Sequence, residues 1–201
     1  MYCKFIKPSF DSLFALTLLI LVSPIILISA LILWIDLGEI PFFKQKRPGL
    51  NEKIFEIIKL KTMYSLDRVK KPIVTEGDRV SKIGGIIRKL SIDELPQLIN
   101  ILKGEMSFIG PRPLIIDYLE LYSTDQKRRH SVKPGISGWA QVNGRNQISW
   151  KEKFDLDLYY VDHLSFTLDI KILILTIKKV IKQEGVNQNS NVPMEPFNGK
   201  N

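Results

Sequence analysis

The longest apolar run in the chain lies near the N-terminus, from Phe10 to Ile35, and reads FDSLFALTLLILVSPIILISALILWI. One straight helix of this length would measure roughly 39 Å at about 1.5 Å per residue, and the hydrocarbon core of a bilayer is about 30 Å thick. Ser23 and Pro24 lie near the middle of the run, where a proline removes a backbone hydrogen bond and kinks the helix. The pattern predicts a membrane helix broken at Ser23-Pro24.

Basic residues flank this run on both sides: Lys4 and Lys7 precede it, and Lys44, Lys46 and Arg47 follow it. Because lysine and arginine mark the cytoplasmic side of a membrane segment, a re-entrant helix that enters and leaves on one face keeps all of them in the cytoplasm. A helix that spans the bilayer once is the less favoured alternative. A cleaved signal peptide is not expected, because the run is too long and no small-residue cleavage site closes it.

The rest of the chain shows shorter patterns. Residues 40–63 alternate between polar and apolar positions around the turn signal Pro48-Gly49-Leu50-Asn51, which predicts a β-hairpin. In residues 91–103, Leu95, Leu98, Ile99 and Leu102 recur at helical spacing and predict a buried helix face, with Gly104 as the end of the helix. The expected fold class is therefore α+β, predominantly α-helical with one short hairpin.

Three later segments also fit helices. Residues 114–129 end in a basic group, Lys127 to Arg129, which fits either compensation of the helix dipole or contact with lipid. Residues 150–163 carry an aromatic stripe typical of a core or an interface, and residues 169–183 suit either the membrane surface or a core helix.

The predicted organisation has three parts. Residues 1–36 form the re-entrant membrane helix, residues 37–185 form a cytoplasmic catalytic domain with interfacial amphipathic helices, and residues 186–201 form a polar, loosely ordered tail. The expected location is the cytoplasmic face of the inner membrane.

The charge balance points to an anionic partner. The formal net charge is +8, which suits nucleic acid, acidic lipid or phosphate-bearing small molecules. The single cysteine, Cys3, excludes an intramolecular disulfide. His130 and His163 lack a third ligand at metal spacing, so a zinc site is not expected. Nucleic acid is disfavoured as a partner, because the chain has no recognition motif and no long basic stripe.

Two adjacent carboxylates, Asp93 and Glu94, lie in the stretch SIDELPQL. Ser91 and Glu94 have the spacing of a capping box, in which each side chain satisfies a backbone N–H at a helix start. Catalysis is the alternative use of the pair, and the spacing alone favours the cap.

Three basic side chains suit phosphate. Lys59 and Lys61 share one face of a strand, which fits either a diphosphate clamp or a solvated surface. Arg112 lies between two prolines, which fits either bidentate phosphate recognition or an ordinary turn.

Several long motifs occur in order: KPSFD at 7–11, the Ser23-Pro24 break, RPGLNEKIFEIIKLKTM, RKLSIDELPQLINILKGEMSFIGPRP and KPGISGWAQVNGR. Over nearly the whole chain they resemble the monotopic phosphoglycosyl transferases, also called bacterial sugar transferases. The resemblance implies transfer of a phosphosugar from a UDP-sugar to undecaprenyl phosphate, with release of UMP, on the cytoplasmic side of the membrane. It also implies Mg²⁺ and a catalytic, metal-binding pair. The implied site residues are Asp93 and Glu94 for catalysis and metal, and Lys59, Arg88, Arg112 and Arg145 for substrate phosphate.

We expect Asp93 to act as a nucleophile through an aspartyl-phosphosugar intermediate, with Glu94 as a supporting carboxylate for metal binding or proton handling. The pKa of the nucleophile is expected not to be raised, because a helix N-terminus favours the anion. Mg²⁺ typically takes one or two carboxylates plus substrate phosphates, which suits the pair.

The stretches WAQVNGRNQISW and FNGKN resemble members that use UDP-N,N'-diacetylbacillosamine in bacterial protein N-glycosylation, with later glycosyltransferases of the same assembly as further partners. Two alternatives stay open: the same reaction with another UDP-sugar for polysaccharide or capsule assembly, and a non-catalytic scaffold tethered to the membrane.

Overall fold

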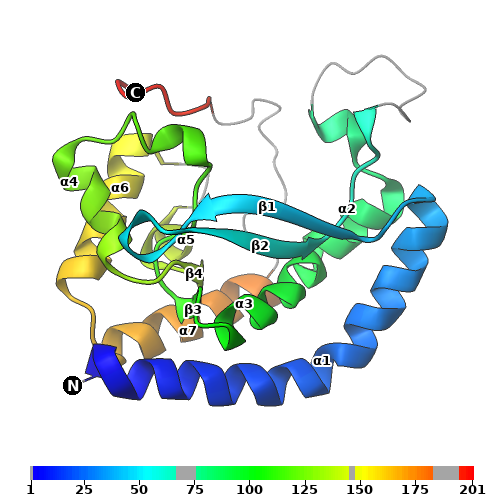
Figure 1. Ribbon diagram of the computed structural model, residues 1–201, viewed down its shortest axis with the longest axis horizontal. Helices are drawn as coiled ribbons and strands as arrows, with labels where there is room; N and C mark the ends of the chain where they lie inside the picture. The colour runs from blue at the N-terminus through cyan, green and yellow to red at the C-terminus, as the bar shows by residue number, and fades with distance from the viewer. Residues whose placement is uncertain (1, 67–75, 145–147, 183–194) are drawn as a thin grey trace.

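The structure is a computed structural model that describes residues 2–66, 76–144, 148–182 and 195–201. A long N-terminal helix lies along one side of a mainly helical domain that also contains two small two-stranded sheets (Figure 1). In chain order the helices and strands are α1 (Lys7–Leu37), β1 (Phe42–Pro48), β2 (Ile54–Leu60), α2 (Lys82–Lys89), α3 (Leu98–Leu102), β3 (Ser107–Ile109), α4 (Thr124–Lys127), β4 (Gly135–Ser137), α5 (Trp139–Asn143), α6 (Trp150–Asp162) and α7 (Phe166–Ile181).

Helix α1 is apolar enough to enter a membrane, and it bends without breaking. Its mean hydropathy reaches 2.9, and Figure 1 shows the helix changing direction near its middle. Pro24 cannot donate a backbone hydrogen bond to the Ile20 carbonyl four residues earlier. The Ser23 hydroxyl donates to that carbonyl oxygen instead, at 2.9 Å. The predicted bend is present, but the predicted break is wrong, because Ser23 satisfies the acceptor that Pro24 leaves free.

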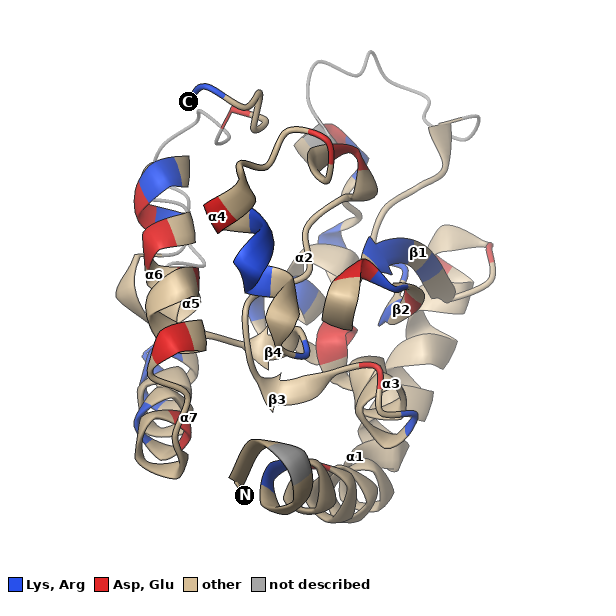
Figure 2. Ribbon diagram, turned by 60° about the vertical axis from the view of Figure 1, so that its left-hand side comes forward, with Lys and Arg blue, Asp and Glu red and all other residues tan. Residues whose placement is uncertain are grey.

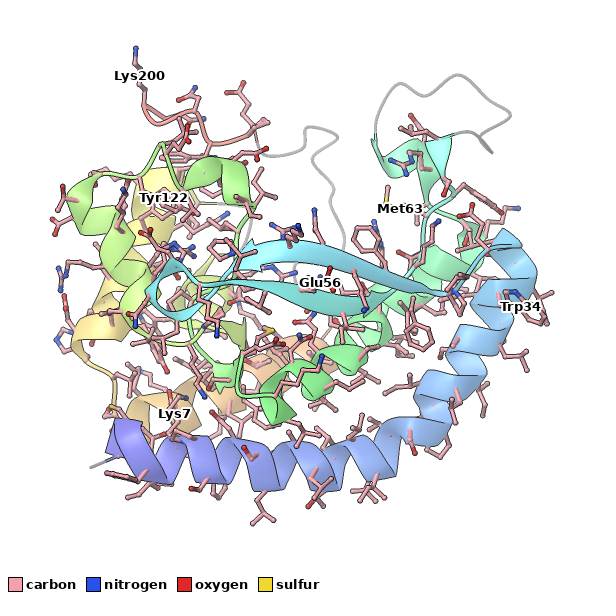
Figure 3. All side chains as sticks on the ribbon, viewed as in Figure 1. Lys7, Trp34, Glu56, Met63, Tyr122 and Lys200 are labelled. Carbon is pink, nitrogen blue, oxygen red and sulfur yellow. The ribbon has the colours of Figure 1, made fainter. Side chains whose placement is uncertain are left out.

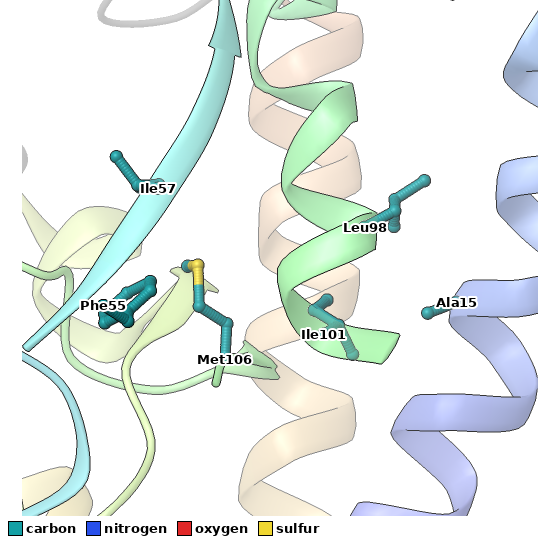
Figure 4. Packing of buried hydrophobic residues seen from close by; sticks show 6 residues of the cluster. All are labelled: Ala15, Phe55, Ile57, Leu98, Ile101 and Met106. Atoms are coloured by element: carbon teal, nitrogen blue, oxygen red, sulfur yellow. The ribbon is translucent and has the colours of Figure 1, made fainter. Parts of the chain in front are cut away.

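Both halves of α1 pack against the same domain. Ala15 belongs to a core cluster with Phe55, Leu98 and Ile101, and Figure 4 shows α3 lying between the hairpin and α1. The second half of α1 contributes a further group of buried residues, Ile26, Ala30, Leu33 and Leu37. The opposite face is left exposed, as at Leu21 (68 %) and Ile35 (73 %). The helix therefore presents one apolar face to the domain and another to its surroundings.

The start of α1 is fixed to the domain by one buried carboxylate. Asp169 of α7 accepts hydrogen bonds from the Tyr2 hydroxyl at 2.5 Å, from Lys7 Nζ at 2.6 Å and from the Tyr160 hydroxyl of α6 at 2.7 Å. Lys7 is labelled at the start of α1 in Figure 3. This network, which we call the Asp169 latch, joins the N-terminal segment to α6 and α7.

The predicted hairpin is confirmed. Strands β1 and β2 pair antiparallel, with Phe42 opposite Leu60 and Pro48 opposite Ile54. Asn100 of α3, fully buried, binds the edge of β2: its Oδ1 accepts from the Ile58 N–H at 3.1 Å, and its Nδ2 donates to the Glu56 carbonyl at 2.7 Å. The hairpin is thereby held against the segment that carries Asp93 and Glu94.

The segment 91–103 differs from the predicted single helix. Ile92–Gln97 is a 3-10 helix, and the α-helix proper covers only Leu98–Leu102. Gly104 follows with a φ of 75°, as expected of a helix end. Within α3 the fully buried side chains are Leu98, Asn100 and Ile101, whereas Leu95, Ile99 and Leu102 are only partly buried. The predicted face is confirmed at Leu98, and Leu95 and Leu102 pack against core clusters while remaining partly exposed. The 3-10 turns shift the helical phase, which explains why Asn100 and Ile101, rather than Ile99, are fully buried.

The predicted helix over 114–129 is wrong. The chain forms a 3-10 turn at Ile116–Tyr118, helix α4, and a second 3-10 turn at Arg128–Ser131. Ser123 starts α4 with a full capping box to Gln126, so the helix begins anew there. The later predictions are confirmed: α6 and α7 lie within residues 150–163 and close to 169–183.

Two features were not predicted. Strands β3 and β4 pair in parallel, with Ser107 opposite Gly135; a Cβ on Gly135 would lie 2.1 Å from the Gly110 nitrogen, so only glycine permits this approach. The described end of the tail, residues 195–201, also contradicts a loosely ordered segment. Phe197 is 4 % exposed and packs among Tyr122, Trp150 and Phe154.

Candidate active site

Asp93 and Glu94 line a cavity of about 680 Å³. Its walls come from α1 and from the rest of the domain, because Leu18 of α1 and Val180 of α7 line it together with Arg88 and Arg112. Figure 2 places acidic and basic ribbon segments close together in the middle of the domain. The cavity is large enough for a whole small-molecule ligand, and it combines charged groups with apolar walls.

The two carboxylates do not form a helix cap. Ser91 has a φ of 57°, and its side chain makes no capping hydrogen bond. The Glu94 side chain points instead to two cations: Lys59 Nζ donates to Oε1 at 2.7 Å, and Arg112 Nη2 donates to the same oxygen at 2.6 Å. The capping-box prediction is therefore wrong, because these tertiary ion pairs take the carboxylate that the cap would need.

The charge state of Glu94 follows from these contacts. Burial disfavours the anion, but the charges and hydrogen bonds of Arg112 and Lys59 outweigh burial and hold the pKa of Glu94 below its usual range. Glu94 is therefore an anion that fixes the positions of Lys59 and Arg112.

Asp93 is in a different position. Within the described part of the chain, no group forms a hydrogen bond or an ion pair with its carboxylate. Burial and the neighbouring charge of Glu94 raise the pKa of Asp93, against the opposing charges of Lys59, Arg88 and Arg112. The expectation that this pKa is not raised is wrong, because burial and a like charge exceed the effect of a short 3-10 turn. Asp93 is the carboxylate that remains available to a ligand.

The structure places the other predicted phosphate-binding residues in different surroundings. Arg88 lines the cavity, and its Nε donates to the Thr62 hydroxyl at 2.7 Å. Lys61 forms an ion pair with Glu39 and lines neither this cavity nor the smaller cavity lined by Lys59, so the structure does not bring it to one site with Lys59. Arg145 lies outside the described residues.

Sequence reasoning missed a buried ion pair that supports the site. Arg129 Nε and Nη2 donate to Asp157 Oδ2 at 3.1 and 2.7 Å. Arg129 Nη2 also donates to the Arg112 carbonyl at 2.8 Å, which holds the proline turn in place. Both side chains are almost fully buried, so the prediction of a dipole-compensating or lipid-facing Arg129 is wrong. One sequence signal could have revealed this ion pair. Asp157 is a charged residue at helical spacing among the aromatic residues that α6 buries, which are Trp150, Phe154 and Tyr160.

No group of three or more His, Cys, Asp or Glu side chains that could hold a metal occurs among the described residues. The cavity nevertheless suits Mg²⁺ bound together with a phosphate ligand, because Mg²⁺ usually needs only one or two carboxylates. Among the described residues, neither oxygen of Asp93 has a hydrogen-bond partner, and Glu94 Oε2 has only a long contact of 3.4 Å to Arg112.

The chain is similar to several known proteins. Residues 2–183 match the family model described as bacterial sugar transferase. The chain is 52% identical to the uncharacterized sugar transferase EpsL of Bacillus subtilis over 194 residues, which covers 96% of each protein. It is 36% identical to the exopolysaccharide production protein ExoY of Rhizobium meliloti, with 89% of this chain and 87% of ExoY covered. It is 37% identical to the UDP-glucose:undecaprenyl-phosphate glucose-1-phosphate transferase of Escherichia coli, with 88% of this chain but only 40% of that longer protein covered.

Proposed function

The chain belongs to the bacterial sugar transferase family, and we propose that it transfers a sugar 1-phosphate from a UDP-sugar to undecaprenyl phosphate, with release of UMP, in polysaccharide assembly. The name of the Escherichia coli relative supports the donor and the acceptor, and the name of ExoY supports the assembly of an exopolysaccharide. These names do not support N,N'-diacetylbacillosamine or protein N-glycosylation, so the proposal adopts the alternative reaction with another UDP-sugar.

One observation carries the proposal: Asp93, a half-buried carboxylate without a partner among the described residues, lies next to a carboxylate that holds two cations. A nucleophile needs a free oxygen, and Asp93 provides one. Phosphoryl transfer also needs positive charge around the phosphates, and Glu94 fixes Lys59 and Arg112 for that purpose.

The proposed reaction has two in-line displacements. A carboxylate oxygen of Asp93 attacks the phosphorus that carries the sugar, the bond from this phosphorus to the UMP oxygen breaks, and UMP leaves with the electron pair. An oxygen of undecaprenyl phosphate then attacks the same phosphorus, the aspartyl–phosphate bond breaks, and the Asp93 carboxylate is restored. Mg²⁺, held by Asp93 and Glu94 together with substrate phosphate, would supply additional charge neutralisation.

We also propose that α1 is re-entrant, with both ends on the cytoplasmic face of the inner membrane. The domain packs along α1 from Ala15 to Leu37. If α1 crossed a hydrocarbon core of about 30 Å, this polar domain would be drawn into the bilayer. The bend at Pro24 and the basic residues on both flanks support a helix that returns to the face it entered.

A UMP-release assay tests the proposed reaction. The purified protein, in detergent with undecaprenyl phosphate and Mg²⁺, would be incubated with a panel of UDP-sugars. We expect release of UMP and formation of a lipid-linked sugar diphosphate with at least one donor. Asp93→Asn should abolish both products, and the exposed Asp155→Asn is the matched control. No UMP from any donor would favour the membrane-tethered scaffold instead.

A further inference from the structure

A second, smaller cavity adjoins the catalytic one at Arg112. It measures about 240 Å³, below the roughly 300–1,000 Å³ of a complete ligand pocket. Arg112 and Leu114 line both cavities. The smaller cavity is lined by residues of β1, β2, the segments around Gln97 and Arg112, and Trp150, with none from α1 or α7 among its described lining. This cavity therefore suits one part of a larger ligand, and that part is not the lipid.

Positive charge is in excess at this cavity. Arg47, Lys59 and Arg112 line it, and the single carboxylate Glu94 binds two of them. The third, Arg47, donates to the neutral Gln45 Oε1 at 2.6 Å and has no acidic partner among the described residues. Three cations that share one carboxylate favour an anion between them.

The cavity also contains a buried amide without a partner. Gln97 is 1 % exposed, and its Nε2 has no hydrogen-bond partner among the described residues. Buried polar groups are nearly always hydrogen-bonded, so an unpartnered amide on a cavity wall points to a ligand. A carboxamide presents one donor beside one acceptor, which matches the N3–H and adjacent carbonyl of uracil. Tyr118 and Trp150 line the same cavity. Trp150 is only 8 % exposed, so the partly exposed Tyr118 is the ring that offers aromatic surface of the kind on which nucleobases stack.

We propose that the smaller cavity binds the uridine monophosphate part of the donor. Gln97 recognises the uracil edge, and Arg47 with Arg112 binds the phosphate that leaves as UMP, while the sugar phosphate occupies the larger cavity beside Asp93. This inference rests on the proposed function. It adds that nucleotide and lipid occupy different cavities that meet at Arg112.

The test measures the binding of UMP to the full-length protein in detergent. Trp150 lies at the cavity, so tryptophan fluorescence should change on binding, and equilibrium dialysis gives an independent dissociation constant. We expect about tenfold weaker UMP binding in Gln97→Leu and in Arg47→Ala, the size of one lost hydrogen bond to a charged or buried group. Gln97→Leu should fold, because it replaces a side chain whose buried Nε2 has no partner among the described residues by an apolar side chain of similar size.

Lys46→Ala is the matched control. It removes one cation from the same strand, at an exposed position outside the cavity, and should bind UMP as the wild type does. Inorganic phosphate separates the two parts of the site: Arg47→Ala should weaken its binding, and Gln97→Leu should not.

UMP binding that is unchanged in both Gln97→Leu and Arg47→Ala, or weakened equally in Lys46→Ala, would overturn the inference. The proposed reaction would stand in that case if UDP-sugars still released UMP. Conversely, a lack of UMP release would refute the reaction, whereas the binding constants would still decide the nucleotide site.

Discussion

The two adjacent carboxylates should respond to neutralisation in opposite ways. Asp93→Asn and Glu94→Gln each replace a carboxylate by an amide of the same shape. Both changes should abolish turnover, but their effects on the free energy of unfolding should differ in sign. The reason is that Glu94 binds two cations, whereas Asp93 has no partner among the described residues.

The size of each effect follows from the contacts. Breaking a fully buried ion pair costs about 3–5 kcal/mol, but the side chains of Lys59 and Arg112 are 22% and 43% exposed, so solvent screens part of the loss. We expect Glu94→Gln to lower the free energy of unfolding by about 1–2 kcal/mol. Asp93→Asn removes repulsion from Glu94 and should raise the free energy of unfolding by about 0.5–2 kcal/mol. Each kcal/mol corresponds to about 2–4 °C in Tm for a chain of this size.

The stability difference should depend on pH. Because the folded state raises the pKa of Asp93, the folded wild type holds this proton more tightly than the unfolded chain does. At pH values below about 3.9, the pKa of Asp93 in the unfolded chain, the wild type should therefore lose no stability relative to Asp93→Asn. It should lose stability as the pH rises through the folded pKa of Asp93.

The assays are thermal unfolding from pH 3.5 to pH 8 and intact-protein mass spectrometry with the UDP-sugar alone. The wild type should release UMP and gain the mass of one phosphosugar, while Asp93→Asn should gain none and lose turnover on the order of 10⁴-fold or more. Near-normal turnover in Asp93→Asn, an adduct on Glu94, or equal destabilisation by the two changes would refute the assignment of roles.

Three further changes test other parts of the structure. Arg112→Lys keeps the charge but loses the planar fork, so kcat/KM should fall about 10- to 100-fold in the UMP-release assay while Tm changes little; full activity would reduce this residue to a turn arginine. Cys3 is a free, exposed thiol and should react with a membrane-impermeant maleimide in inverted vesicles but not in intact spheroplasts. Labelling of intact spheroplasts would establish a spanning helix. Pro24→Ala should straighten α1 and increase the fraction of molecules labelled in this way. Asp169→Asn leaves the donors of the Asp169 latch without a charge partner and should cost about 3 kcal/mol in thermal unfolding, whereas Asp155→Asn, at an exposed pair, should cost less than about 0.5 kcal/mol; equal losses would mean that the latch adds nothing.

Several elements could be predicted because their signal is local. The hairpin follows from alternation around Pro48 to Asn51, and α6 and α7 follow from helical periodicity and their serine caps. The apolar run and Pro24 gave the position of the bend in α1. The helix continues through the bend because of another local contact, the hydrogen bond from the Ser23 hydroxyl to the Ile20 carbonyl.

The site was predictable only in its residue types. The sequence by itself determined that two carboxylates are adjacent and that Arg112 is held between prolines. It could not show that Glu94 binds Lys59 and Arg112, which lie 35 and 18 residues away in the chain, nor that Lys61 binds Glu39 instead. Ion pairs between distant residues leave no periodic pattern, because they depend on how helices and strands pack.

The same reason explains the supporting residues. Arg129 is the last of three basic residues in sequence, and only its burial against Asp157 makes it the group that holds the Arg112 turn. Gln97 follows a proline in the sequence, and only the packing of the hairpin over it buries its Nε2 beside Arg47 without a partner among the described residues. The sequence therefore determined which chemical groups are available and, through local signals, the hairpin, α6, α7 and the apolar run of α1. It did not determine the short turns within residues 114–129 or the pairing of β3 with β4. The packing decided which carboxylate is paired and which is free, because burial and charge pairing are properties of the folded chain.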